Sequence, residues 1–169
     1  MSEHVQLIAQ HIPRLRRYAR ALLGNRNAAE DLVQDTLERA WGRFNLWRRG
    51  SDLRAWLFTI MHNIYVNQVR ARIARPEHEL DDEALRVQVR ADQGDRLEIH
   101  DLDQALRQLS DEQREVLLLV GLEQLTYDEA AKSLGIPIGT VMSRLSRARA
   151  RLRAVLEGRS IVTNLKVVK

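Results

Sequence analysis

The stretch Thr126–Leu152 reads TYDEAAKSLGIPIGTVMSRLSRARARL and has the pattern of two helices joined by a tight turn. Thr126 followed by Glu129 is a capping box, which predicts the start of the first helix. Gly135 supplies the tight turn at its end, and a second helix is predicted to run from about residue 139 to 157. Two helices with this spacing are typical of a helix-turn-helix DNA-binding module.

The predicted second helix has one apolar face and one face that suits DNA. The apolar positions fall on one side and are expected to pack inward: Val141, Leu145, Ala148, Leu152 and Val155. The opposite side has small or polar residues at its centre and arginines along both edges: Thr140, Met142, Ser143, Arg144, Ser146, Arg147, Arg149, Ala150, Arg151 and Arg153. Small central residues permit close approach to base edges, and arginines bind phosphates. The alternative is a solvated arginine-rich face, but the turn, the caps and the charge together favour DNA recognition.

Upstream of this module the sequence predicts more helices. One runs from about residue 97 to 109, and Ser110 with Gln113 forms a capping box for the next. Near the N-terminus a helix over residues 5–23 is broken or kinked at Pro13. Asn27 is predicted to cap the following helix, which has an apolar stripe and an acidic face. That acidic face lies within an otherwise basic part of the chain.

The stretch Trp41–Tyr65, WGRFNLWRRGSDLRAWLFTIMHNIY, holds six of the eight aromatic residues, mixed with arginines. This mixture suits single-stranded nucleic acid, since aromatic rings stack on bases and arginines neutralise phosphates. An aromatic helical core is the competing interpretation. A loop is expected at residues 45–51, followed by a helix capped by Ser51 or Asp52 and ending near Ile73. One arc of that helix is polar and is predicted to face nucleic acid, with a solvated face as the alternative: Thr59, His62, Asn63, Val66 and Arg70.

The charge of the 169-residue chain is segregated. Residues 13–75 carry a net charge of +8 and residues 140–169 carry +7, whereas residues 76–103 carry −7. Two basic segments separated by an acidic one indicate two surfaces for a polyanion. Residues 76–94 are predicted to be an acidic linker, which either keeps itself solvated or mimics nucleic acid. The tail, residues 159–169, has no predicted role.

No motif or cluster in the sequence predicts catalysis. The Walker loop, GxSxG, GxGxxG and HExxH patterns are absent, and the five histidines are scattered, so we expect no enzyme, no metal and no cofactor. With no cysteine, no run of about 18 apolar residues and no signal-like N-terminus, the sequence predicts a cytoplasmic protein without membrane insertion.

Three segments together resemble the conserved regions two and four of bacterial extracytoplasmic function (ECF) sigma factors. They are AAEDLVQDTLERAW, SDLRAWLFTIMHNIYVNQVRAR and LSDEQREVLLLVGLEQLTYDEAAKSLGIPIGTVMSRLSRARARL, in the order and spacing of that family. FTIMHN and LVGLEQLTYDEAA are similar to its general-stress subgroup. The resemblance implies an all-α protein with a region 2 domain over residues 1–75 and a region 4 domain over residues 95–158, joined by a flexible linker.

The resemblance also implies partners and roles for residues. One helix would bind the clamp coiled coil of core RNA polymerase through Asp31, Leu32, Gln34, Asp35 and Glu38. The loop with Trp47, Arg48 and Arg49, together with Asn63, would capture a flipped base of the minus-ten element, and the last helix would read the minus-thirty-five element. The polymerase flap and an anti-sigma factor are further implied partners.

A second hypothesis needs no polymerase. A dimeric helix-turn-helix regulator would use residues 1–75 for dimerisation or ligand binding, and it would bind a palindrome by itself. It leaves the mixture of aromatic and basic residues unexplained.

Overall fold

The computed structural model describes residues 3–74 and 95–167, and these form helices without any strand. The all-α fold class is therefore confirmed, whereas the predicted linker over residues 76–94 lies outside the described residues. None of the described helices is sufficiently long and apolar to span a membrane.

The N-terminal half, residues 3–74, consists of α1 (Glu3–Ala9), α2 (Ile12–Leu23), α3 (Arg26–Gly42), the short 3-10 turn η1 (Phe44–Leu46) and α4 (Leu53–Ala74). As predicted, the chain breaks next to Pro13, which occupies the first turn of α2, where a missing N–H does no harm. Gly24 ends α2 with φ of 70°, in the left-handed region that glycine adopts without strain.

N-terminal caps mark the starts of the two longer helices in this half, α3 and α4. The cap of α3 was predicted at Asn27, but Asn25 takes this position, because its side chain accepts the N–H of Ala28 at 3.0 Å. Asp52 caps α4 as predicted, accepting the N–H groups of Arg54 and Ala55 at 2.9 and 3.3 Å. Four apolar residues at helical spacing on the other side of α4 are all buried: Leu53, Leu57, Ile60 and Ile64.

The C-terminal half, residues 95–167, consists of α5 (Asp95–Arg107), α6 (Asp111–Leu117), the π-helical turn η3 (Leu118–Leu122), α7 (Tyr127–Leu134) and α8 (Ile138–Val167). Both predicted capping boxes are present, at Ser110 with Gln113 and at Thr126 with Glu129. Gly135 has φ of 66° and ends α7, as the turn pattern predicted. The buried Arg114 ties α5 to α6 by donating to the carbonyl oxygens of Leu106 and Leu109, each at 2.8 Å.

The last helix is longer than predicted. Its end was expected near residue 157, but α8 continues to Val167. Gly158 lies inside it, and a helical glycine costs only about 1 kcal/mol relative to alanine, which long flanking helix can offset. The tail that was set apart at residues 159–169 thus begins as a continuation of α8.

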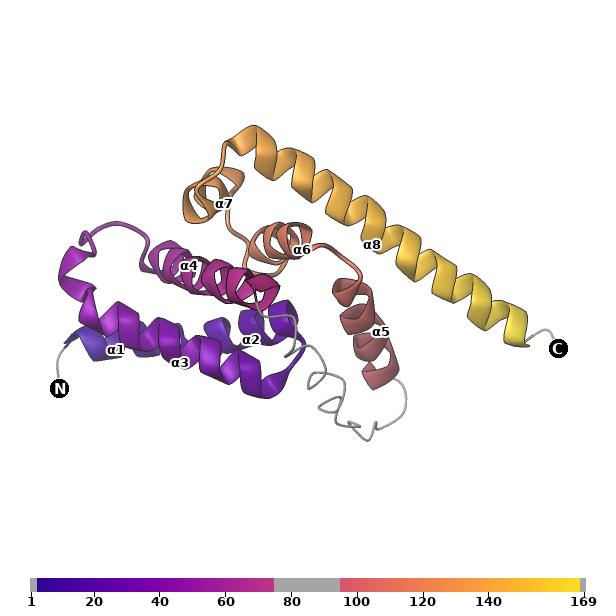
Figure 1. The fold of residues 1–169 in the computed structure, drawn as a ribbon, viewed down its shortest axis with the longest axis horizontal. Coiled ribbons are helices and arrows are strands. Elements are labelled where there is room, and N and C mark those ends of the chain that lie inside the picture. The colour runs from indigo at the N-terminus through magenta and orange to yellow at the C-terminus, as the bar shows by residue number, and fades with distance from the viewer. Residues whose placement is uncertain (1–2, 75–94, 168–169) are drawn as a thin grey trace.

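The two halves pack against each other around α4 (Figure 1). α4 contacts α3 on one side and α7 on the other, while α8 runs along α6 and reaches past α5. The buried apolar residues of both halves form one cluster, which joins α4 residues such as Leu57 to Leu125 and Ala130 of the C-terminal half. We call this packed state the closed arrangement.

Candidate nucleic-acid interface

The predicted DNA face of α8 is open to solvent. Ser143, Ser146, Arg147 and Arg149 are exposed, and Met142 is 52% exposed. Two residues of this face are less accessible to DNA, since Thr140 is half-buried and Arg144 forms an ion pair with Glu112 of α6 at 3.5 Å. The inward positions are covered as predicted: Val141, Leu145 and Ala148 are buried, and Leu152 and Val155 are half-buried. α8 is therefore anchored by one face and presents the other.

A shallow groove beside this face includes a residue that the sequence analysis did not single out. Tyr127, at the start of α7, lines the groove together with Met142, Ser146, Arg149 and Arg153 of α8. The sequence offered one indication of this role: Tyr127 directly follows the Thr126 cap and therefore belongs to the first turn of α7, beside which α8 packs.

The polar arc of α4 is in part covered by the C-terminal half. The Thr59 hydroxyl donates to Ser133 of α7 at 3.2 Å, and His62 Nδ1 lies 2.5 Å from a carboxylate oxygen of Glu115 of α6. Val66 is half-buried, whereas Asn63 and Arg70 are exposed. The structure thus separates this predicted group into covered and free residues.

The His62–Glu115 pair is flanked by a second polar contact. Burial raises the pKa of the Glu115 carboxyl, and the hydrogen bond and charge of His62 partly offset this rise. Tyr65 on α4 donates its hydroxyl to Asp111 at 3.1 Å, and burial, with the charge of Asp111, raises the Tyr65 pKa above its ordinary value. Tyr65 therefore remains a neutral donor at physiological pH.

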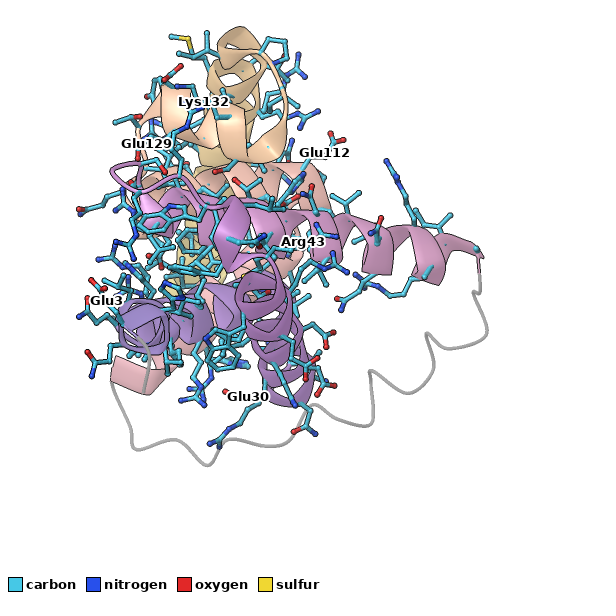
Figure 2. The ribbon with its side chains drawn as sticks, turned by 90° about the vertical axis from the view of Figure 1, so that its left-hand side faces the viewer. Glu3, Glu30, Arg43, Glu112, Glu129 and Lys132 are labelled. Atoms are coloured by element: carbon cyan, nitrogen blue, oxygen red, sulfur yellow. The ribbon has the colours of Figure 1, made fainter. Side chains whose placement is uncertain are left out.

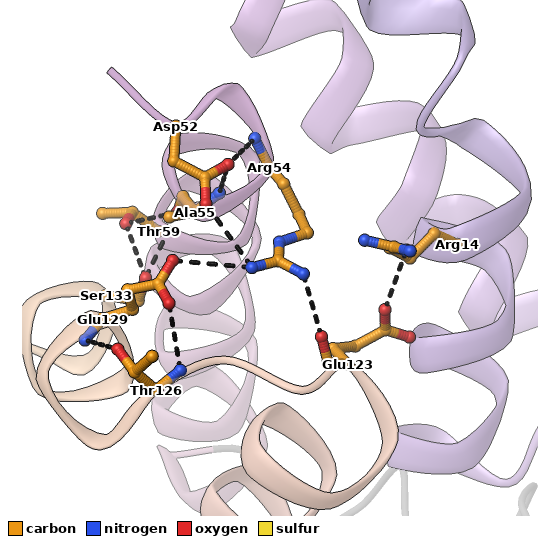
Figure 3. A network of polar contacts seen from close by, with 9 residues as sticks. All are labelled: Arg14, Asp52, Arg54, Ala55, Thr59, Glu123, Thr126, Glu129 and Ser133. Atoms are coloured by element: carbon orange, nitrogen blue, oxygen red, sulfur yellow. Dashed lines mark hydrogen bonds and ion pairs between the residues drawn. The ribbon is translucent and has the colours of Figure 1, made fainter.

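A group of arginines from α2 and α4 meets two glutamates of the C-terminal half (Figure 3). The Glu123 side chain has no exposed surface and pairs with Arg14 at 3.3 Å and with Arg17 at 3.2 Å. Arg54 donates to the backbone carbonyl of Glu123 at 3.2 Å and pairs with Glu129 at 3.5 Å. Burial raises the pKa of the Glu123 carboxyl, and the hydrogen bond and charge of Arg17 act against that rise.

One further contact joins the halves at the end of α2. Arg107 of α5 donates to the carbonyl oxygens of Ala21 and Leu22, the latter at 2.7 Å. These carbonyls lie at a helix C-terminus, where they have no intrahelical partner and attract a cation. A Cβ at Gly24 would lie 2.9 Å from Arg107 Nε, so a larger residue there would require the Arg107 side chain to shift, in addition to the strain of the positive φ.

The loop predicted to capture a base is partly tucked into the N-terminal half. Trp47 is half-buried and lies 5.3 Å from Phe44 between ring centroids, and its indole Nε1 is buried without a hydrogen-bond partner among residues 3–74 and 95–167. Phe44 in turn stacks on His4 of α1 at 4.2 Å. Arg48 and Arg49 are exposed, and Arg49 lies 3.8 Å from Glu3. The core interpretation holds for Phe44 and Phe58, which are buried, whereas a nucleic-acid role for Trp47 stays a prediction.

The acidic face of α3 is exposed with one exception. Asp31, Gln34, Asp35 and Glu38 are exposed to solvent. Leu32 has no exposed surface and belongs to the core, because it lies on the same side of α3 as the buried Ala29 and Thr36. Its predicted contact with polymerase stays a prediction, and the closed arrangement presents only the other four residues to a partner.

Two family models match the chain in the order that this architecture requires. Residues 8–62 match the sigma2 domain of PhyR, and residues 99–152 match region 4 of sigma-70. An ECF RNA polymerase sigma factor, EcfG of Rhodopseudomonas palustris, is 39% identical over 86% of this chain and 80% of its own length. The chain belongs to the ECF RNA polymerase sigma factors. Its function is that of a DNA-binding transcription initiation factor, and the resemblance of its sequence to this family is confirmed.

Solved structures agree with this assignment to the ECF sigma factors. The sigma factor RpoE, solved in complex with the anti-sigma factor NepR from Bartonella quintana, superposes with a TM-score of 0.76 at 38% identity over 90% of this chain and 95% of that one. CnrH, solved with the cytosolic domain of CnrY, has a TM-score of 0.66 at 31% identity over 90% and 86% of the two chains.

Proposed function

We propose that this sigma factor uses α3 to bind core polymerase, the α4 arc and the Trp47 loop at the minus-ten element, and α8 at the minus-thirty-five element. In this proposal residues 1–75 and 95–158 act as separate domains once residues 76–94 let them move apart. The protein has no enzymatic activity of its own, and its binding energy drives promoter opening. Unstacking a base costs a few kcal/mol, and stacking on an aromatic side chain returns roughly 1–3 kcal/mol.

The proposal rests on one observation: of the two surfaces predicted to bind DNA, one is exposed to solvent and the other is partly covered. α8 presents Ser143, Ser146 and Arg147 to solvent, whereas Thr59 and His62 of α4 are in contact with Ser133 and Glu115. Free protein is therefore expected to bind promoter DNA poorly, and polymerase binding is expected to favour separation of the halves. A dimeric regulator that acts alone has no need for this arrangement.

The relatives also suggest a partner that keeps the protein inactive. RpoE and CnrH were solved with NepR and CnrY. We infer that an anti-sigma factor binds this chain while its halves are packed together. Such a factor would stabilise the closed arrangement by the free energy of its own binding.

The experiment that tests the function is transcription from a promoter with purified core polymerase, with and without this protein, beside a gel shift by the protein alone. We expect initiation that depends on both components and weak binding by the free protein. Tight binding to a palindrome without polymerase, together with no initiation, would favour the dimeric regulator instead.

The polymerase contact can be tested separately. Asp35→Arg places a cation on the exposed acidic face of α3. If that face meets a basic surface, like-charge contact costs several kcal/mol, and core affinity falls by about a hundredfold or more. Glu98→Arg makes the same change of two charge units at an exposed position of α5 and serves as control. Unchanged affinity of Asp35→Arg for core would remove this face from the interface.

A further inference from the structure

The contact around Glu123 has more positive than negative charge. Arg14 and Arg17 share this one carboxylate, and their side chains remain 41% and 55% exposed. The positive charge of Arg54 is compensated by two carboxylates, because Arg54 pairs with Asp52 at 3.4 Å and with Glu129 at 3.5 Å. When the halves separate, Glu123 and Glu129 leave with the C-terminal half, while all three arginines stay with the N-terminal half.

The way in which Glu123 is held resembles the way in which arginines hold a phosphate. Nη2 of Arg17 reaches both carboxylate oxygens of Glu123, at 3.2 and 3.3 Å, and Arg14 reaches one of them from the same helix. Arginines bind carboxylates and phosphates with the same planar set of donors. A site that accepts the carboxylate therefore has donors that suit a DNA phosphate.

The arginines also lie beside the polar arc of α4. Arg54 is in the first turn of α4, and the neighbouring Ala55 carbonyl accepts hydrogen bonds from Thr59 at 2.9 Å and from Ser133 at 3.2 Å. Figure 3 shows Ala55 and Thr59 facing Ser133 of α7, while the Arg54 side chain reaches between Glu129 and Glu123, so that Arg54 and the arc contact the same half from neighbouring positions. Separation of the halves would uncover the arginines and the arc together, on one surface of the N-terminal half.

We propose that Arg14, Arg17 and Arg54 form a binding site for the phosphate backbone of promoter DNA, which Glu123 occupies in the closed arrangement and vacates when the halves separate. This rests on the function proposed above and adds to it a contact on α2. DNA is favoured over an acidic protein, because residues 13–75 carry a net charge of +8 and the site adjoins the predicted minus-ten surface.

α2 itself offers a matched control. Arg16 and Arg20 likewise share one carboxylate, that of Glu30 of α3, at 3.3 and 3.5 Å, but this partner is in the same half, so that separation of the halves leaves the pairing unchanged. Figure 2 shows Glu30 at the opposite end of the molecule from Glu129, which partners Arg54. Replacing Arg16 and Arg20 removes the same charge from the same helix without touching the proposed site.

The test measures the dissociation constant of holoenzyme for promoter DNA against salt concentration, with core polymerase and the full chain. For Arg14→Gln with Arg17→Gln, we expect affinity to fall by on the order of tenfold per lost contact at 0.1 M salt, and the salt slope to fall by about 2. Arg16→Gln with Arg20→Gln should leave both unchanged. Arg14→Lys with Arg17→Lys keeps the charges, so most of the slope should return.

Glu123→Gln separates a DNA site from a contact that only holds the halves together. Both Glu123→Gln and the double arginine-to-glutamine variant weaken the closed arrangement, so a merely structural role predicts that both variants change promoter binding in the same direction. We expect opposite directions when both variants are measured as free protein: Glu123→Gln strengthens promoter binding, and the arginine variant weakens it. Equal salt slopes for the arginine variant and wild type, with thermal unfolding unchanged, would overturn the proposal.

Two other outcomes are distinguishable from these. If the double arginine variant loses affinity for core polymerase and keeps its salt slope on DNA, the site binds an acidic protein and the proposal fails. If wild-type protein supports no initiation with core, the proposed function fails before the site is tested, whereas a failure of the site alone leaves initiation by wild type intact.

Discussion

α4 and α8 are the two helices predicted to touch DNA, and they differ in what covers their polar faces. On α8, Ser146 and Arg147 are exposed, because only the opposite face packs against α6 and α7. On α4, Thr59 and His62 point at the C-terminal half and bond to it. A polar face on a helix shows only that this face does not pack in an apolar core. The pattern does not tell whether the face contacts water or another polar surface.

The difference has an energetic consequence for access to the promoter. Buried polar groups that pair across an interface are costly to leave unpaired but contribute little net stability when water can replace the partner. The closed arrangement has many such pairs, including His62–Glu115 and Arg17–Glu123. These polar pairs therefore allow the two halves to separate at a small cost in free energy. The buried apolar face of α8, by contrast, keeps that helix packed in place.

The largest expected effect comes from the exposed helix. Arg147→Ala removes a central cation from the α8 face, and loss of a base-reading or phosphate contact costs about 1–3 kcal/mol, or roughly 5- to 150-fold in promoter affinity of the holoenzyme. Folding should be unaffected, since Arg147 is exposed. The measurement is binding to promoters with and without a minus-thirty-five element.

Arg26→Ala is the control for this change, because it removes the same charge from an exposed position at the start of α3. If Arg147→Ala loses affinity equally on both promoters, the α8 face does not read that element and the comparison between the helices breaks down.

A second prediction concerns the covered helix. His62→Ala leaves Glu115 buried without its partner, at 6% side-chain exposure, which costs about 1–3 kcal/mol and shifts the halves toward separation by roughly tenfold. Because the chain has no cysteine, dyes at Asn27→Cys and Lys132→Cys report the separation by energy transfer. Asn63→Ala, an exposed neighbour, should leave the transfer efficiency unchanged. Equal efficiencies for His62→Ala and wild type would count against the interface.

The smallest expected effect is a pH dependence of closure. Burial raises the pKa of Glu115 and of Glu123 in the closed arrangement above the ordinary value of 4.5, so the closed state binds protons more tightly than the open one. Closure is thus favoured most below pH 4.5, and this contribution is lost as pH rises through the raised pKa values. The same dye pair checks the sign. In Glu115→Gln part of this dependence should disappear, and an opposite slope in wild type would refute the assignment.

Local rules predicted much of this fold correctly. The capping boxes at Ser110 and Thr126, the glycine turn at Gly135, and the cap at Asp52, which was one of two candidates, all depend on residues within a few positions of one another. Such short-range chemistry is visible in a sequence without any knowledge of what packs where. The family resemblance added the order of the two regions.

What the sequence did not predict had two causes: competing local signals, and contacts between residues that lie far apart along the chain. Asn25 and Asn27 are equally good caps, and only the geometry of the chain after Gly24 decides for Asn25. Leu32 was grouped with an acidic face to which its side chain does not belong. The contact between Arg17 and Glu123 joins residues 106 positions apart, and no periodicity predicts a pairing over such a distance. The roles of the site residues on DNA and polymerase remain predictions.

The same distance along the chain has a consequence for a protein that is still being synthesised. The residues that cover the polar arc of α4 come late in the chain: Glu115 lies 53 positions after His62, and Ser133 lies 74 positions after Thr59. At about 5–20 residues per second, a ribosome needs roughly 3 to 15 s to make the intervening chain. During that interval a newly made N-terminal half has its arginines and its polar arc uncovered, so its first encounter with polymerase can precede its own inhibition.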